Sequence, residues 1–301
     1  MTQQPITPVE EARKKTFQLL HEDLPSFSKH CLKIRSEQGI IPFVFNPAQL
    51  YVHRKLEEQK QKLGFVRAII LKARQLGMST YVAARFFHRT LLEQGMTSFI
   101  LSHEAKSTGN LFDMVKRFND YLPAGFSIGL DTSNKNQLKF TGTESEYIVG
   151  TAGNEDVGRS MTIKQLHMSE AAFYEHTDQL ETGLMQAVAD RPGTEIIIES
   201  TANGLGNFFH EKTMRAMSGQ GLYQLIFIPW FWEQKYRLPI PDGFAPDEKE
   251  IELMKLYGLE LDQIYWRRMK IEGTKGGEWK FAQEMPASPD EAFLMSGERF
   301  Y

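Results

Sequence analysis

The feature that most constrains the fold of this chain is a short turn that joins an apolar run to a helix-like pattern. The apolar run covers residues 65–71, and the turn, KARQLGMST, covers residues 72–80. A strand, a Gly-containing turn and a helix in this order direct backbone N–H groups toward an anion at the helix N-terminus. We therefore expect a phosphate-binding loop, although an ordinary turn with a Ser or Thr N-cap fits the same residues.

The turn matches the phosphate-loop pattern G-x-x-x-x-G-K-[ST] only in part. Gly77 and Ser79 fit the pattern, whereas Lys72 replaces its first Gly and Met78 replaces its Lys. Positive charge is still present, because Lys72 and Arg74 enter the turn from the strand side. The sequence therefore predicts a loop whose lysine comes from the preceding strand.

Composition is that of a soluble globular protein, with 41% hydrophobic and 24% charged residues among 301. The length suggests roughly two domains, or one domain with appendages. No run of about 18 apolar residues and no signal-peptide pattern is present, so no membrane span or export is expected. Cys31 is the only cysteine, which suits a reducing cytoplasm. A net charge of −3 argues against a stand-alone nucleic-acid binder but permits a local basic patch.

Apolar and helical patterns alternate along the chain, which predicts a parallel sheet with crossover helices. Residues 7–35 are expected to form one or two amphipathic helices, interrupted at Pro25. An Asn-Pro pair at residues 46–47 predicts the start of a helix that ends near Gly64. The expected strands are 65–71, 97–102, 163–168, 194–200 and 222–228, with short strands at 137–140 and 146–149 in a hairpin-like insert; further helices are expected at 104–121, 246–257 and 260–272.

Polar residues follow the main strands, where a parallel sheet presents its ligand site. Glu170 comes directly after one strand, at the position from which a nucleotide hydrolase orients the attacking water. Ser169 stands where an Asp would normally contact Mg²⁺, so it is expected to act through water while Glu170 serves both metal and water. A carboxylate that only stabilises a helix N-terminus is the alternative for Glu170.

Two arginines are candidates for neutralising charge on a transferred phosphate, a role worth about 10³–10⁵ in rate. Arg74 lies inside the turn and would act within its own chain. Arg159 lies in a Gly-containing loop, residues 153–160, and would reach the site of a neighbouring subunit. An ordinary surface arginine is the alternative for Arg159.

Other polar positions complete the candidate site. Ser79 is the expected Mg²⁺ ligand, with an N-cap role as its alternative and Thr80 in reserve. Gln49 has an amide that can read the donor and acceptor edge of adenine, or it is a solvated helix residue. Thr201 and Asn203 end a strand beside the site and either sense the γ-phosphate or form a turn. The sequence contains no H-E-x-x-H and no G-x-S-x-G, and GTAG at 150–153 is a weak motif.

The ordered set of motifs resembles the large terminase subunit of tailed double-stranded DNA phages. The set comprises a Gln at a helix start, K-x-R-Q-x-G-x-S-T, GRS before SEAAF, and STANG. The tail segments YWRR (265–268), FAQEMP (281–286) and EAF (291–293) resemble the end of that family's ATPase region. The resemblance covers about residues 40–301.

The resemblance implies an α/β P-loop NTPase of the additional-strand (RecA-like) type, with a mostly parallel sheet flanked by helices and a small helical lid. It implies that Glu170, Arg74 and Arg159 are catalytic. The implied ATP-binding residues are Gln49, Lys72, Ala73, Arg74, Gln75, Leu76, Gly77, Met78, Ser79 and Thr80. The implied coupling residues are Ser200, Thr201 and Asn203, and the implied Mg²⁺ ligands are Ser79 and Glu170, with Ser169 through water. The implied organisation is an N-terminal cap (1–40), an ATPase core (41–235) and a lid or linker (236–301).

The implied function is ATP- and Mg²⁺-dependent translocation of viral double-stranded DNA into a procapsid, in the bacterial host cytoplasm. The implied partners are the DNA, a portal protein, a small terminase subunit and other copies in a ring, expected to be a pentamer; the isolated chain could be a monomer. Members of the family carry a C-terminal nuclease domain that would begin near Tyr301, so we expect an ATPase-domain fragment without DNA cleavage. A helicase-type motor and a non-catalytic nucleotide-binding assembly module, the latter motivated by Met78 and Ser169, remain as alternatives.

Overall fold

The computed structural model describes residues 8–152, 161–175, 177 and 180–293. The α-helices are α1 (Pro8–Glu22), α2 (Leu24–Cys31), α3 (Pro47–Leu63), α4 (Met78–Leu92), α5 (Ala105–Asp120), α6 (Phe208–Met217), α7 (Glu248–Tyr257), α8 (Leu261–Glu272) and α9 (Gly277–Glu284). The strands are β1 (Lys33–Ser36), β2 (Gly39–Pro42), β3 (Val66–Lys72), β4 (Thr97–Ser102), β5 (Leu130–Ser133), β6 (Gln137–Phe140), β7 (Glu146–Thr151), β8 (Gln165–Ser169), β9 (Glu195–Ser200) and β10 (Gln224–Ile228). Short helical turns cover Ala171–Phe173, Leu180–Leu184, Trp230–Trp232 and Glu291–Phe293. Within the described residues, no helix has both the length and the apolar character needed to cross a membrane.

Eight strands form one sheet in the order β10-β3-β9-β8-β4-β7-β6-β5. The six strands from β10 to β7 are parallel. At the edge of the sheet, β6 pairs antiparallel with β7, and β5 pairs antiparallel with β6. Strand β9 lies between β3, which leads into the predicted phosphate loop, and β8, which leads to Glu170. This inserted strand confirms the additional-strand α/β fold that the sequence predicted.

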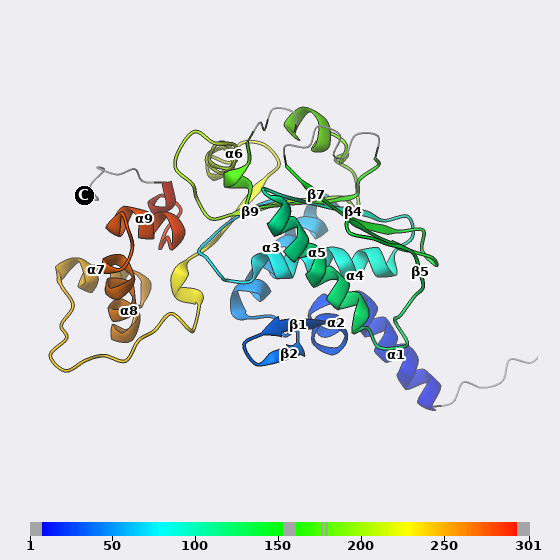
Figure 1. Cartoon of the computed structure of the whole chain (residues 1–301), viewed down its shortest axis with the longest axis horizontal. Helices are drawn as coiled ribbons and strands as arrows, with labels where there is room; N and C mark the ends of the chain where they lie inside the picture. The colour runs from blue at the N-terminus through cyan, green and yellow to red at the C-terminus, as the bar shows by residue number, and fades with distance from the viewer. Residues whose placement is uncertain (1–7, 153–160, 176, 178–179, 294–301) are drawn as a thin grey trace, which may run out of the picture.

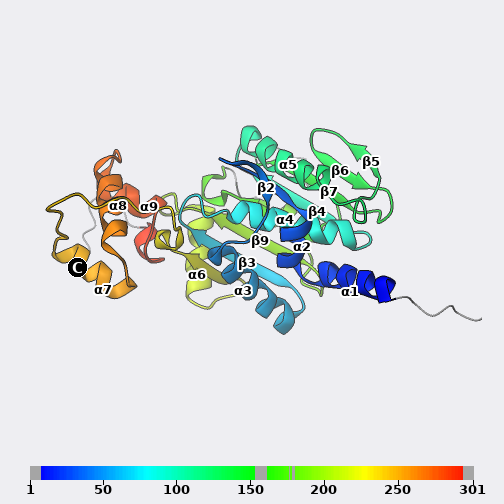
Figure 2. The same cartoon turned by 90° about the horizontal axis from the view of Figure 1, so that it is seen from below.

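The sheet is covered by helices on both faces, as Figure 1 and Figure 2 show, with α6 on one face and α3, α4 and α5 on the other. The alternation of side chains along β3 explains this arrangement. Ala68 and Ile70 join the hydrophobic cluster that contains α3 and α4, whereas Ile69 and Leu71 join the cluster that contains α6. All seven residues of β3 are buried, which accounts for the continuous apolar run in the sequence.

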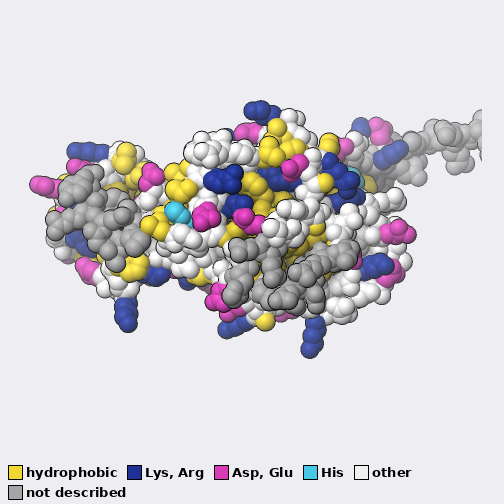
Figure 3. Space-filling view, turned by 90° about the horizontal axis from the view of Figure 1, so that it is seen from above, with side chains coloured by type: hydrophobic (Ala, Val, Ile, Leu, Met, Phe, Trp, Pro, Cys, Tyr) yellow, Lys and Arg dark blue, Asp and Glu magenta, His cyan; other side chains and the backbone are white. Residues whose placement is uncertain are grey.

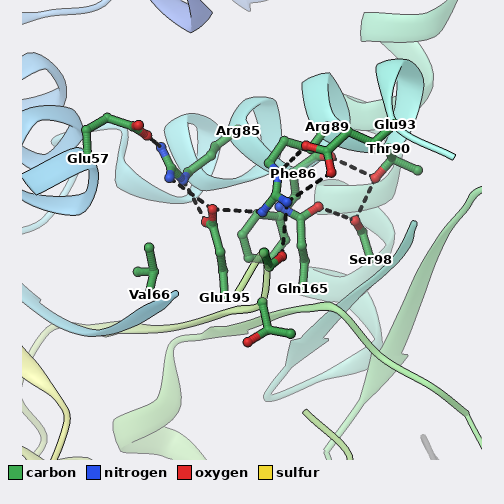
Figure 4. A network of polar contacts seen from close by, with 12 residues as sticks. Glu57, Val66, Arg85, Phe86, Arg89, Thr90, Glu93, Ser98, Gln165 and Glu195 are labelled. Carbon is green, nitrogen blue, oxygen red and sulfur yellow. Dashed lines mark hydrogen bonds and ion pairs between the residues drawn. The ribbon is translucent and has the colours of Figure 1, made fainter. Parts of the chain in front are cut away.

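A buried network of charges fixes helix α4, the helix that begins at the predicted phosphate loop (Figure 4). Glu195 of β9 accepts a hydrogen bond from Arg85 Nε at 2.7 Å and one from Arg89 Nη1 at 2.9 Å. Arg85 also donates to Glu57 of α3 at 2.5 Å, and Arg89 pairs with Glu93 at 2.7 Å. Glu195 is 1% exposed, so its charge depends on these arginines. The network thereby holds α4 in a defined position against β9.

The ends of the described chain differ in part from the sequence expectation. The predicted N-terminal helices are present as α1 and α2, but the expectation of helix through Arg35 was wrong because residues 33–36 form β1. Strand β1 pairs antiparallel with β2 through a turn in which Gly39 has a φ of 97°, and this hairpin spans the expected boundary at residue 40. Near the C-terminal end, α7 and α8 confirm the two expected helices, whereas α9 was not predicted.

Aromatic side chains connect the C-terminal helices to the core. Trp266 of α8 stacks on Trp230 at a ring-centroid distance of 5.2 Å and on Tyr236 at 4.3 Å. Phe281 of α9 lies edge-on to both indole rings. Figure 1 shows α7, α8 and α9 grouped at one end of the molecule, beside the point where the strands leading to the candidate site end. This aromatic group is therefore placed to hold the lid helices next to the site.

Buried histidine makes the stability of this fold sensitive to acid. Burial lowers the pKa of His88 from its ordinary 6.5 to about 4, and its Nε2 bonds the Leu20 carbonyl oxygen at 3.0 Å. Between pH 6.5 and 4 the unfolded chain therefore binds a proton that the folded chain does not, so stability falls as the pH falls through this window. We expect urea unfolding of His88→Gln to show a smaller loss of stability across this window than the wild type. Equal losses would show that His88 does not titrate on unfolding.

Candidate active site

The loop between β3 and α4 has the backbone conformation of a tight, strained turn. Gln75 has a φ of 59°, and Gly77, at the N-cap of α4, has a φ of 72°. A Cβ on Gly77 would lie 2.7 Å from Gln49 Nε2, so this position needs Gly for space as well as for φ. Helix α4 begins at Met78 without a side-chain cap. Its first N–H groups are therefore available at the end of the loop, as anion binding requires.

Side chains of the loop divide between the core and the surface. Ala73, Leu76 and Met78 are at most 1% exposed and belong to the hydrophobic cluster around α4. The core location of Met78 explains why this position carries no lysine, because an ammonium group there would be buried in apolar surroundings. Lys72 instead places its ammonium group at the site, with a side chain that is 7% exposed.

Lys72 lies between two carboxylates from neighbouring strands: Glu199 is within β9, and Glu170 directly follows β8. Its Nζ is 3.2 Å from Glu170 Oε1 and 3.0 Å from Glu199 Oε2. Burial alone would lower the pKa of Lys72, but the charges of Glu199 and Glu170 outweigh it and raise the pKa above its usual value. The structure therefore brings the predicted loop and Glu170 together.

Glu170 is held in an unusual backbone conformation. Its φ is 58°, and the other non-Gly residues with positive φ among those described are Gln75 and Glu144. Two of these three strained positions thus lie in the candidate site, where strain is most often found. The side chain of Glu170 is 29% exposed, so its carboxylate is accessible.

Glu199 is a member of the site that the sequence analysis missed. Its Oε1 accepts hydrogen bonds from Ser79 Oγ and from Ser169 Oγ, each at 2.6 Å, and lies 3.3 Å from His167 Nε2. Burial raises the pKa of Glu199, but Lys72, His167 and Ser169 lower it well below its usual value. These partners therefore favour the charged form of the Glu199 carboxylate, although it is fully buried. Ser79 does not cap α4, and its alternative role as an N-cap is not observed.

A cavity of about 350 Å³ opens beside these groups. Its lining residues are Lys72, Arg74, Gln75, His103, Ser107, Glu170 and Phe173. His103 and Ser107 were not predicted, although the polar sequence that follows β4 resembles the polar sequences that follow β8 and β9. The His103 Nδ1 atom is buried without a hydrogen-bond partner among the described residues.

Arg74 lines this cavity but is held by the lid. Its Nε donates to Glu284 Oε2 at 2.6 Å, its Nη2 donates to Glu284 Oε1 at 3.3 Å, and its backbone N donates to the Glu284 carbonyl oxygen at 3.1 Å. Tyr236 Oη donates to the Arg74 carbonyl oxygen at 2.9 Å. The loop and the last lid helix, α9, are therefore directly connected through Arg74.

The predicted coupling residues contact both the turn after Glu170 and the lid. Ser200 Oγ accepts a hydrogen bond from Ala172 N at 3.2 Å, and Asn203 Nδ2 donates to the Ala172 carbonyl oxygen at 3.3 Å. Gln283 Nε2 of α9 donates to Asn203 Oδ1 at 3.3 Å. The hydroxyl of Thr201 is buried without a partner among the described residues. Hydrogen bonds therefore connect the Glu170 turn to α9 through Asn203.

The remaining predicted residues are placed as follows. Gln49 lies against the loop, where its Nε2 donates to the Gly77 carbonyl oxygen at 2.8 Å and its Oε1 accepts from Asn46 N at 2.9 Å. The bond to Asn46 N completes the capping box of α3, and the bond to Gly77 ties the same amide to the loop, so contact of Gln49 with adenine stays a prediction. Thr80 is half-buried in the first turn of α4. Arg159 lies outside the described residues.

No family model matches the sequence. The crystal structure of the HK97 bacteriophage large terminase aligns with a TM-score of 0.61 and 12% identity, over 84% of this chain and 52% of that one. The large terminase ATPase domain of Thermus phage P74-26 aligns with a TM-score of 0.47 and 19% identity, over 70% of this chain and 91% of that one. This chain therefore spans about half the length of the HK97 protein that it matches. The first of these comparisons shows that the chain has the fold of the HK97 bacteriophage large terminase.

Proposed function

We propose that this chain is the ATPase of a DNA-packaging motor, as in a phage large terminase. The observation that carries the proposal is the position of Lys72 between the strained loop and the accessible carboxylate of Glu170, 3.2 Å away. A triphosphate in the adjoining cavity would meet the ammonium group of Lys72, the guanidinium group of Arg74 and the Glu170 carboxylate together. This combination fits phosphoryl transfer to water and fits no other chemistry that the sequence suggested.

The residues also fit a Mg²⁺ ion bound together with a nucleotide. The site offers the hydroxyls of Ser79 and Ser169 and the carboxylate of Glu170, all oxygen donors of the kind that Mg²⁺ prefers. Among the described residues no group of three or more His, Cys, Asp or Glu side chains could hold a metal alone, so phosphate oxygens would complete the coordination. The ion would neutralise charge on the phosphates. The chain's own residues position the nucleotide and the water.

Within this mechanism Glu170 orients the attacking water, and Lys72 holds the phosphates. An incoming phosphate would compete with Glu284 for the guanidinium group of Arg74, which lines the same cavity. Release of Arg74 would loosen the contact between the loop and α9. Asn203 and Gln283 form a second contact, which connects the Glu170 turn to the same helix. Nucleotide binding would thereby move the lid. We propose that Arg159 acts in trans on a neighbouring subunit. Arg159 itself lies outside the described residues.

The DNA-packaging role rests on the fold shared with the HK97 bacteriophage large terminase. We propose double-stranded viral DNA, a portal protein, a small terminase subunit and further copies in a ring as partners, in the host cytoplasm on a procapsid. We also propose the division into a cap (1–40), an ATPase core (41–235) and a lid or linker (236–301). Basic and acidic side chains are interspersed on the face seen in Figure 3, so this face alone does not identify a DNA-binding surface.

Substitution of Lys72 tests nucleotide binding directly. We expect Lys72→Met to weaken Mg-ATP binding by about 10–100-fold, because it removes a charge-assisted hydrogen bond worth about 1.5–3 kcal/mol. Isothermal titration calorimetry measures this change, with circular dichroism to check folding. Lys139→Met, at an exposed lysine of β6, is the matched control and should bind like the wild type. Unchanged affinity in a folded Lys72→Met variant would contradict the proposed phosphate site.

A further inference from the structure

Position 169 carries Ser in place of the expected Asp, and an acidic side chain from the neighbouring strand lies beside it. Ser169 of β8 is the register partner of Glu199 of β9, and the Ser169 hydroxyl donates directly to the Glu199 carboxylate. The same carboxylate oxygen accepts the hydroxyl proton of Ser79, at the start of α4. A carboxylate therefore lies against both hydroxyls that the proposed Mg²⁺ site contains, although neither β8 nor the loop provides it.

The orientation of Glu199 follows from the alternation of β9. Glu195, Ile197 and Glu199 are spaced two residues apart and share the face of the strand that packs on α4. Glu195 binds the second half of α4 through Arg85 and Arg89, and Glu199 binds its first turn through Ser79. The two glutamates thus fix both halves of α4. Anchoring alone, however, does not require a full charge at Glu199.

Charge at the site suggests a role beyond anchoring. Glu199 is 0% exposed, yet Lys72 is the one Lys or Arg that forms an ion pair with it among the described residues, and Lys72 is shared with Glu170. Two carboxylates therefore face one ammonium group. A cation beside Ser79 would balance this excess of negative charge, whereas a solely structural hydrogen-bond acceptor would be less costly as an amide.

Hydrogen-bond direction indicates how Glu199 would act. Because Ser79 and Ser169 donate their protons to Glu199, the lone pairs of both hydroxyl oxygens are directed away from the carboxylate and can face a cation. Carboxylates that orient metal ligands in this way strengthen binding without touching the metal. Full burial of Glu199 behind Ser79 and Lys72 fits such an indirect position.

We propose that Glu199 is the positioning carboxylate of the Mg²⁺ site: it holds the Ser79 and Ser169 hydroxyls as ligands and supplies the negative charge that Ser169 does not. This inference rests on the proposed nucleotide site and assigns its metal dependence to a residue of β9. The inference predicts that a carboxylate introduced at position 169 can take over the role of Glu199.

The test measures ADP affinity with Mg²⁺ and with EDTA, for the wild type and the variants Glu199→Gln and Ser169→Asp/Glu199→Gln. We expect Mg²⁺ to tighten ADP binding to the wild type. In Glu199→Gln the ratio of ADP affinity with Mg²⁺ to ADP affinity with EDTA should fall by about 10–100-fold relative to the wild type. The double variant should recover a large part of the gain. Electron paramagnetic resonance of Mn²⁺ with ADP gives a second readout, in which Glu199→Gln should leave more Mn²⁺ free.

The outcomes separate the two proposals. The role of Glu199 is overturned if Mg²⁺ increases the ADP affinity of Glu199→Gln as much as that of the wild type. It is also overturned if this increase is lost in Glu199→Gln and Ser169→Asp does not restore it. Either result leaves the nucleotide site intact. Absence of ADP binding by the wild type under both conditions overturns the proposed function, and this inference with it. If Glu199→Gln does not fold, Glu199→Asp carries the test, because it keeps the charge near Lys72 but withdraws the carboxylate from Ser79. An unchanged gain in that variant also overturns the inference.

Discussion

Glu170→Gln is expected to lower steady-state phosphate release from ATP by about 10²–10⁴-fold, the range that general acid–base catalysis contributes. The amide has the shape of the carboxylate but cannot orient and polarise the attacking water as a base. Lys72 keeps its ion pair with Glu199 in this variant, so the phosphate loop should stay ordered. We therefore expect the Mg-ADP affinity to stay within about threefold of the wild-type value. In binding free energy this is less than about 1.4 kcal/mol, which corresponds to a tenfold change.

The matched control for this prediction is Glu175→Gln, an exposed glutamate that follows the same short helical turn. It should release phosphate at the wild-type rate. Equal rates in Glu170→Gln and the wild type would show that the strained carboxylate has no part in hydrolysis. Such a result would favour a non-catalytic nucleotide-binding module.

Glu195→Ala is expected to produce the largest loss of stability, about 3 kcal/mol in the free energy of unfolding, because it removes the carboxylate that two buried guanidinium groups share. Arg85 and Arg89 are 3% and 7% exposed, and each would keep a single carboxylate partner, Glu57 and Glu93 respectively. Figure 4 shows that Glu195 lies between the two guanidinium groups. Urea denaturation followed by circular dichroism measures the change.

Glu93→Ala provides the comparison, because Glu93 pairs with Arg89 but its side chain is 41% exposed. Glu93 is partly screened by solvent and Arg89 would keep Glu195, so the loss should be less than about 1 kcal/mol and this variant should unfold close to the wild-type midpoint. Similar losses in the two variants would mean that burial of Glu195 does not determine the strength of the network.

Local patterns were sufficient to predict the parallel sheet, the loop and Glu170. The apolar run of β3 and the Gly in the following turn are contained in one short stretch of sequence, and so is the polar pair that ends β8. Strand order is not local, because it depends on which strands pair across long separations. Glu199 was missed for this reason: its strand reads as a buried Ile run, and the importance of an acid at its end appears only when β9 lies between β3 and β8.

The lid contacts were also beyond the reach of sequence patterns. Helix α9 is short, begins at the second of two consecutive glycines and follows a turn, so its periodicity gives a weak signal. Its Glu284 lies 210 residues from Arg74 in sequence, and an ion pair across such a distance has no local pattern. The helix expected through Arg35 was wrong for a similar reason, because β1 is stabilised by pairing with β2 and not by its own propensity.

The most direct test of the central claim is a crystal structure of this chain with Mg²⁺ and a non-hydrolysable ATP analogue. The account predicts that the phosphates lie in the loop between β3 and α4, that Lys72 contacts the terminal phosphates, and that the Glu170 carboxylate faces the γ-phosphate across one water molecule. A nucleotide bound elsewhere on the molecule, or a Glu170 carboxylate turned away from the terminal phosphate while Lys72 keeps both of its carboxylate partners, would contradict it.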